Sequence, residues 1–318
     1  MTFLPRLIVV ALSAFGLVNI VASLVLLLVW RPPAGTATAR SRVWFQGRMI
    51  PAAASLLAGL LAVSAFLRFE PREDPEDMSM LLIALAAITV AVWTTASARL
   101  LRTRLAAGRS LRWWMAAAEP IEVRGIAVPA FVVNIGFPIV AVVGLFRPRL
   151  IVSRAVLDAC SEAEMQAILA HEAWHLVRRD NIRRVLLSAA PDVLSWLPRA
   201  VRFSEEWQRA SEEAADDAAA RLGPAGRVHL AEALVRVARL APAPGHQLSC
   251  PLPASALYRG ESIERRVRRV LDPTLDVRAG SRTWRLPLTF VFAIVFVLSL
   301  LNLGVVQELV EIAVRHLP

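Results

Sequence analysis

Residues 161–178 read SEAEMQAILAHEAWHLVR, and this stretch predicts an amphipathic helix. Ser161 followed three residues later by Glu164 is the capping-box pattern that begins helices. Apolar residues then recur at helical spacing: Met165, Ile168, Leu169, Leu176 and Val177. His171 and His175 are one turn apart, so both imidazoles leave the same face of the helix. That is the geometry needed for two ligands of a tetrahedral zinc ion.

The motif His171-Glu172-Ala173-Trp174-His175 also contains a candidate base. Zinc lowers the pKa of water, and Glu172 can accept the proton of a water that attacks a peptide carbonyl. The pattern H-E-x-x-H on a helix is typical of zinc peptidases. The alternative is two surface histidines with an incidental glutamate between them. The motif alone does not decide between these two interpretations.

A third protein ligand is needed, and a second helical stretch supplies candidates. Residues 211–218 read SEEAADDA. Glu212 and Asp216 share one helix face, and Glu213 and Asp217 share another. One carboxylate of a pair can bind zinc while the other orients a ligating histidine. A solvated acidic face is the alternative, but the alanine-rich helix is suited to close packing.

The composition predicts a membrane protein. The chain has 318 residues, 56% of them hydrophobic, and a mean hydropathy of +0.53, which is too apolar for an ordinary soluble domain. Four uncharged runs are long enough to cross a bilayer. They are residues 7–30, 49–67, 78–98 and 286–307. We therefore expect a mainly α membrane protein, in which four transmembrane helices flank an inserted zinc-protease domain, helical with a small β-sheet.

The distribution of arginine predicts the orientation. The formal net charge is +10 and the chain has no lysine. The arginines cluster beside apolar runs, in residues 31–48 and 99–112, and no groove-reading motif is present. This favours membrane lipid over nucleic acid as a partner. By the positive-inside rule these loops are cytoplasmic. We expect residues 1–112 to hold three spans, 113–283 a cytoplasmic peptidase domain, and 284–318 the fourth span and a short tail, in a bacterial inner membrane.

For three further segments the sequence allows more than one structure. Residues 125–146 contain no charge, but Pro129, Asn134, Gly136 and Pro138 divide the run into pieces of strand length. Short strands are favoured, and a membrane helix is the alternative. Residues 185–203 predict a hydrophobic hairpin near the membrane. Residues 261–271 predict an amphipathic basic helix, most simply solvated with one face packed by Ile263, Val267 and Val270. Resting on anionic lipid or on the protease domain is the alternative.

These residues together resemble the BlaR/MecR-type membrane zinc metallopeptidases, which are related to the heat-shock-type membrane metalloproteases. The similarity is carried by GLFRPRLIVS at 144–153, by the H-E-x-x-H motif, by RRDN at 178–181 and by the later Glu-x-x-Ala-Asp. The resemblance implies His171 and His175 as zinc ligands and Glu172 as catalytic base. It implies Glu212 as third ligand and Asp216 as the carboxylate that orients a histidine, because Glu213 lacks the matching alanine. Asp180 also fits the family pattern, but a structural role explains it as well as a catalytic one.

The same resemblance implies a function. An edge strand within 131–153 would bind substrate in extended form. We expect zinc-dependent endopeptidase activity on a cytoplasmic protein, with a transcriptional repressor as one candidate. A quality-control protease and a non-catalytic membrane transducer or docking protein are the alternatives.

Antibiotic sensors of this family carry a C-terminal penicillin-binding domain, which we do not expect here because the chain ends at Pro318 without any lysine.

Overall fold

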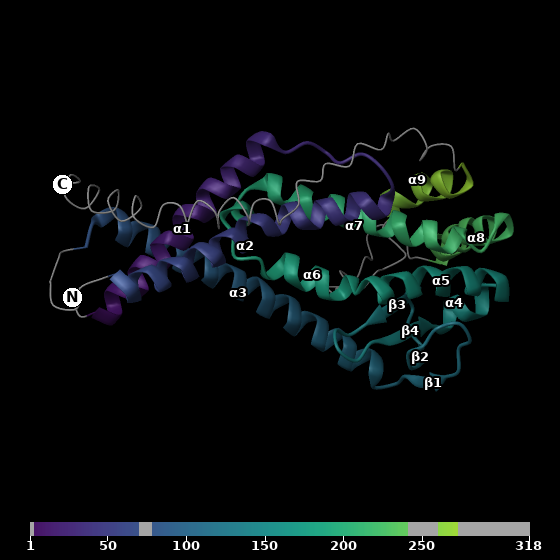
Figure 1. The fold of residues 1–318 in the computed structure, drawn as a ribbon. Helices are drawn as coiled ribbons and strands as arrows, with labels where there is room; N and C mark the ends of the chain where they lie inside the picture. Colours follow the sequence, from purple (N-terminus) through teal and green to yellow (C-terminus); the bar gives the residue numbers. More distant parts are fainter. Residues whose placement is uncertain (1–2, 70–77, 241–259, 273–318) are drawn as a thin grey trace.

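The computed structural model describes residues 3–69, 78–240 and 260–272 (Figure 1). The fold is mainly helical with a small mixed sheet. Three long helices come first: α1 (Phe3–Val29), α2 (Ala37–Phe69) and α3 (Met80–Met115). Figure 1 shows them packed together at one end, while the sheet lies with α4 (Arg154–Ala159), α5 (Glu162–Arg178) and α8 (Pro224–Leu240) at the other end.

Within the described residues, these three helices are long and apolar enough to cross a membrane. The predicted spans at 7–30, 49–67 and 78–98 fall on them. Both α2 and α3 extend beyond the apolar runs, and α3 continues through the predicted boundary at residue 112 as far as Met115. The predicted fourth span at 286–307 lies outside the described residues.

Small residues let α1 approach α3 closely. The Ser13 hydroxyl donates to the Leu82 carbonyl, and the Thr89 hydroxyl donates to the Leu12 carbonyl, each over 2.7 Å. A Cβ atom on Gly16 would lie 2.7 Å from the Leu85 carbonyl oxygen. This contact requires glycine, as is common where membrane helices pack tightly.

The uncharged run at 125–146 contributes strands to a sheet and does not form a membrane helix. The run supplies β2 (Ala130–Val133) and β3 (Val140–Val143), while β1 (Glu119–Ile121) precedes it and β4 (Arg149–Ser153) follows it. Their order in space is β1-β2-β4-β3. Strands β2 and β4 are parallel and the other pairs are antiparallel. Prolines and glycines keep each segment short, and β3 is left at one edge.

Both faces of the sheet are buried at β2, β3 and the middle of β4, which explains why these segments are apolar. On one face Val142, Leu150 and neighbouring side chains pack in the core with residues of α5 and α8. On the other face Ala141 and Ile151 pack against Trp114, near the end of α3. The sheet therefore joins the α3 extension to the helix that carries the H-E-x-x-H motif.

The hairpin predicted at 185–203 is formed by α6 (Asp180–Ala189), a 3₁₀ turn at Val193–Trp196 and the start of α7 (Pro198–Ala220). It is tied to all three long helices. Asn19 of α1 donates to the Pro191 carbonyl over 3.0 Å. Arg48 of α2 forms a buried ion pair with Asp192. Arg99 of α3 donates to the Ala190 carbonyl over 3.0 Å.

Candidate metal centre

The capping box at the start of α5 forms as predicted. Ser161 Oγ accepts from the Glu164 N–H over 3.3 Å, and Glu164 Oε2 accepts from the Ser161 N–H over 2.6 Å. His171 and Glu172 have no exposed surface and His175 is 4% exposed. The alternative of two surface histidines therefore does not describe this helix.

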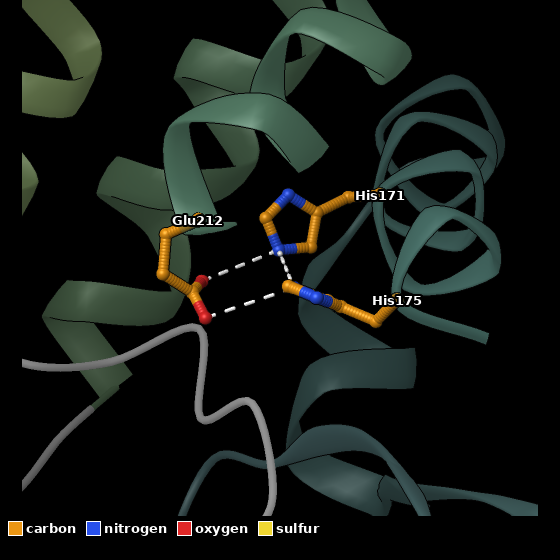
Figure 2. Close-up of side chains that lie close together, drawn as sticks. All are labelled: His171, His175 and Glu212. Atoms are coloured by element: carbon orange, nitrogen blue, oxygen red, sulfur yellow. Dashed lines mark hydrogen bonds and ion pairs between the residues drawn. The ribbon is translucent and has the colours of Figure 1, made fainter. Parts of the chain in front are cut away.

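Helix α7 brings Glu212 to the two histidines (Figure 2). The two Nε2 atoms are 3.2 Å apart. Glu212 Oε2 lies 3.5 Å from His171 Nε2, and Glu212 Oε1 lies 3.6 Å from His175 Nε2. Atoms that bind one tetrahedral zinc ion at about 2.0–2.1 Å lie about 3.3 Å from one another. The three side chains fit such a ligand set.

The neighbouring glutamate is engaged elsewhere. Glu213, the alternative third ligand, forms an ion pair with Arg40 of α2 over 2.6 Å. Arg265 also lies 3.9 Å from it. The geometry therefore favours Glu212 for the metal position, and the identity of the ligand stays a prediction.

Each histidine also contacts a buried aspartate through Nδ1. Asp216 Oδ1 lies 3.0 Å from His171 Nδ1, and Asp180 Oδ2 lies 2.8 Å from His175 Nδ1. Ser211 donates to the same Asp180 oxygen over 2.6 Å. The contact of Asp180 with His175 has hydrogen-bond geometry, whereas that of Asp216 with His171 is close without it. A carboxylate beside Nδ1 favours a proton there and leaves Nε2 as an electron-pair donor, which is the usual arrangement around metal-binding histidines. Sequence reasoning had left the role of Asp180 open.

Glu172 is joined to the edge strand. Its Oε2 accepts a hydrogen bond from the Val142 N–H over 3.1 Å. The Asn181 side-chain amide donates to the carbonyls of Val142 over 2.9 Å and Gly144 over 3.1 Å. Gly144 has φ 102°, and a Cβ there would lie 2.7 Å from the Arg147 carbonyl oxygen, so the turn after β3 needs glycine. Strand β3 is thus held against the helices that carry the site.

The charges of the site suit a divalent cation. Two arginine side chains, each at most 10% exposed, lie beside Glu212: Arg184 and Arg266. Arg183 also contacts Asp180 over 3.4 Å, but its side chain is 28% exposed and solvent screens it. Four buried carboxylates face these two guanidiniums: Glu172, Asp180, Glu212 and Asp216. With both histidines neutral, as metal binding requires, and all four carboxylates ionised, the site holds two negative charges in excess, which a dication would offset.

The pKa values reflect this crowding. Burial raises the pKa of Glu172, which brings a candidate base closer to neutral pH. Burial also acts to raise the pKa of Glu212 and Asp216, but nearby cationic groups outweigh it. The pKa of Glu212 is lowered, and that of Asp216 is lowered to about 2. Burial acts to lower the pKa of His171, but the carboxylates of Asp216 and Glu212 raise it to about 9.

Sequence reasoning did not single out Arg266, which the structure places against the site. Arg266 lies on α9 (Gly260–Leu271), for which packing through Ile263, Val267 and Val270, and docking on the protease domain, were among the expectations. Its Nε and Nη2 donate to both oxygens of Asp216, over 2.8 and 2.7 Å. A signal was present, because Arg266 falls on the same helical face as Ile263 and Val270, which pack in the core. An arginine within an apolar stripe indicates a buried ion pair.

Apolar helices of membrane-spanning length, joined to a buried His-His-Glu group, are the features expected of a membrane-associated metallopeptidase. A family model described as BlaR1 peptidase M56 matches residues 52–270, which is more than half of the chain. The chain therefore belongs to the M56 peptidase family, as its motifs had indicated. The match runs from α2 almost to the end of α9 and includes every residue of the site. A search of curated proteins gave no match.

Proposed function

We propose that this protein is a zinc-dependent endopeptidase. In this proposal His171, His175 and Glu212 hold the zinc ion, and Glu172 is the catalytic base. One observation carries it: ligand-type atoms from α5 and α7 lie 3.2–3.6 Å apart, and the helix that supplies both histidines also supplies a buried glutamate. Membership of the M56 peptidase family supports it further.

The chemistry follows from the side chains. When bound, zinc supplies Lewis-acid activation of a water molecule and of the peptide carbonyl. Glu172 accepts the proton of the attacking water and delivers it to the nitrogen of the leaving amine. Asp216 and Asp180 keep the Nδ1 protons of the two histidines in place, so that each Nε2 faces the metal position.

The substrate in this proposal is a cytoplasmic protein that binds in extended form along β3. Among the described strands β3 lies at the edge of the sheet, and an edge strand favours backbone recognition with little sequence preference. The arginine-rich segments at 31–48 and 99–112 support a cytoplasmic peptidase domain, at 113–283, in a bacterial inner membrane. By family resemblance alone, a transcriptional repressor is one candidate substrate and a signalling role follows from it.

The experiment compares the detergent-purified wild type with His171→Ala, after purification without chelators and with zinc supplied. We expect about one zinc per chain in the wild type and loss of it in the variant. The wild type should then cleave an unfolded protein such as casein. Zinc without cleavage would favour the transducer alternative, and cleavage of many membrane proteins in cells would favour quality control. No zinc in either sample would overturn the proposal.

A further inference from the structure

Arg266 is unusual because it is a charged side chain that is only 3% exposed. Burying a guanidinium is costly unless carboxylates surround it in good geometry. Arg266 meets that condition with a two-point contact to Asp216, and its Nη1 lies 3.6 Å from Glu212 Oε2. The guanidinium therefore lies between the carboxylate that contacts His171 and the carboxylate proposed as a ligand.

Helix α9 is fixed over α7 by contacts on either side of Arg266. Ile263 and Val270 pack in the same core as α5 and α8. Arg269 donates to the Glu213 carbonyl over 3.0 Å and to Asp217 Oδ1 over 2.6 Å. The docked helix thus fixes the place of Arg266, so that its guanidinium can hold neighbouring side chains in place.

We propose that Arg266 is a positioning residue of the metal centre, and that docking of α9 completes the site. The inference rests on the proposed zinc function. Asp216 Oδ1 contacts both His171 Nδ1 over 3.0 Å and Arg266 Nη2 over 2.7 Å. The guanidinium fixes the plane of the Asp216 carboxylate, and that carboxylate in turn fixes the His171 ring.

The charge of Arg266 has a second effect. Glu212 and Asp216 are one turn apart on one face of α7, and like charges at that spacing repel. The guanidinium between them offsets this repulsion in a site where solvent cannot screen it. Lysine keeps the charge but cannot make the two-point contact, so Arg266→Lys should retain only part of the effect.

The experiment measures zinc affinity of the full-length protein in detergent by competition with a chromophoric chelator. Arg266→Met should raise the zinc Kd by about 10- to 100-fold, the usual cost of losing a residue that supports a ligand. Arg266→Lys should fall between Arg266→Met and wild type. Arg268→Met is the matched control, because Arg268 lies on the same helix, is 75% exposed and pairs with Glu264.

A double-variant cycle separates positioning from general destabilisation. If Arg266 acts through Asp216, then adding Arg266→Met to Asp216→Asn should change the Kd little further. The double variant also removes both buried charges, so it gives a folded protein to measure where Arg266→Met alone unfolds. A wild-type Kd in Arg266→Met, or fully additive effects in the double variant, would overturn the inference. Wild-type protein that binds no zinc would instead overturn the proposed function itself.

Discussion

The carboxylate of Glu172 accepts a hydrogen bond from the backbone N–H of Val142, so the candidate base on α5 is joined directly to the edge strand β3. The backbone N–H of Ser153 in β4 donates to the Ile139 carbonyl. Because hydrogen-bonded and non-hydrogen-bonded pairs alternate along antiparallel strands, the N–H and carbonyl of Val142 point away from β4. A peptide that added to this edge would use the same N–H. In the proposed binding mode, the peptide would therefore compete with Glu172 for the Val142 N–H.

Glu172→Gln should keep zinc and abolish most hydrolysis. Glutamine retains an oxygen that can accept from the Val142 N–H, so the fold should be preserved, but its amide cannot accept the proton of the attacking water. Loss of a general base typically lowers kcat by about 100- to 10,000-fold. Zinc content and casein turnover, measured on the same preparation, test this. Turnover close to wild type would remove Glu172 as the base.

Glu212→Ala should weaken zinc binding far more than Glu213→Ala. Glu212 lies 3.5 and 3.6 Å from the two histidine nitrogens, whereas Glu213 pairs with Arg40. Removing a ligand should exceed the roughly 10- to 100-fold loss that follows removal of a supporting residue. The adjacent variant is the matched control for loss of acidic charge on α7. The reverse order of affinities would move the third ligand by one residue.

The features that were predictable from sequence depend on local signals. The capping box at Ser161, the one-turn spacing of His171 and His175, and the long apolar runs each act within one helix. Breakers such as Pro129 and Pro138 likewise restricted 125–146 to short strands. These signals are sufficient to predict the helical class, the small sheet and the metal motif.

The remaining features depend on contacts between distant segments. Asp216 and Arg266 are 50 residues apart in sequence, and no local pattern pairs them. The contact of Asp180 with His175 depends on Arg179, which adopts a left-handed conformation at φ 53° and turns the chain from α5 into α6. That conformation is uncommon for a residue other than glycine, so it was not predictable. The family resemblance, more than the spacing, favoured Glu212 over Glu213.

Asp180→Asn should lower zinc affinity by about 10- to 100-fold. The asparagine amide can donate to His175 Nδ1, which favours the tautomer protonated at Nε2, and that tautomer cannot bind a metal through Nε2. The chelator-competition assay measures the change. Asp158→Asn, at an exposed position, is the control and should match wild type. An unchanged affinity in Asp180→Asn would leave Asp180 with a structural role only.

Cys160 should react slowly with iodoacetamide at pH 8. Burial and the nearby Glu164 carboxylate raise the pKa of its thiol to about 11. Because the thiolate is the reactive form, the rate should be roughly 200-fold below that of a thiol with the ordinary pKa of about 8.5. The rate should rise about tenfold per pH unit between pH 8 and 10, because the fraction of thiolate rises about tenfold per unit below the pKa. A Cys250→Ser background isolates the signal, and a rate that levels off near pH 9 would contradict the shift.

The ion pair between Arg48 and Asp192 should anchor the α6–α7 hairpin to the membrane helices. Arg48→Met leaves the Asp192 carboxylate buried without this partner, which typically costs about 3–5 kcal/mol. We expect a clear fall in the apparent Tm in detergent. Asp192→Asn added to Arg48→Met should recover much of it, because the asparagine oxygen can still accept from the Ser195 N–H.

Arg42→Met, an exposed position on the same helix, is the control for charge loss and should leave the Tm unchanged. The hairpin joins α6, which carries Asp180, to α7, which carries Glu212. Arg48→Met should therefore also weaken zinc binding, although Arg48 is not among the residues that contact the histidines. A lowered Tm with unchanged zinc affinity would show that the hairpin supports the fold without positioning the metal centre.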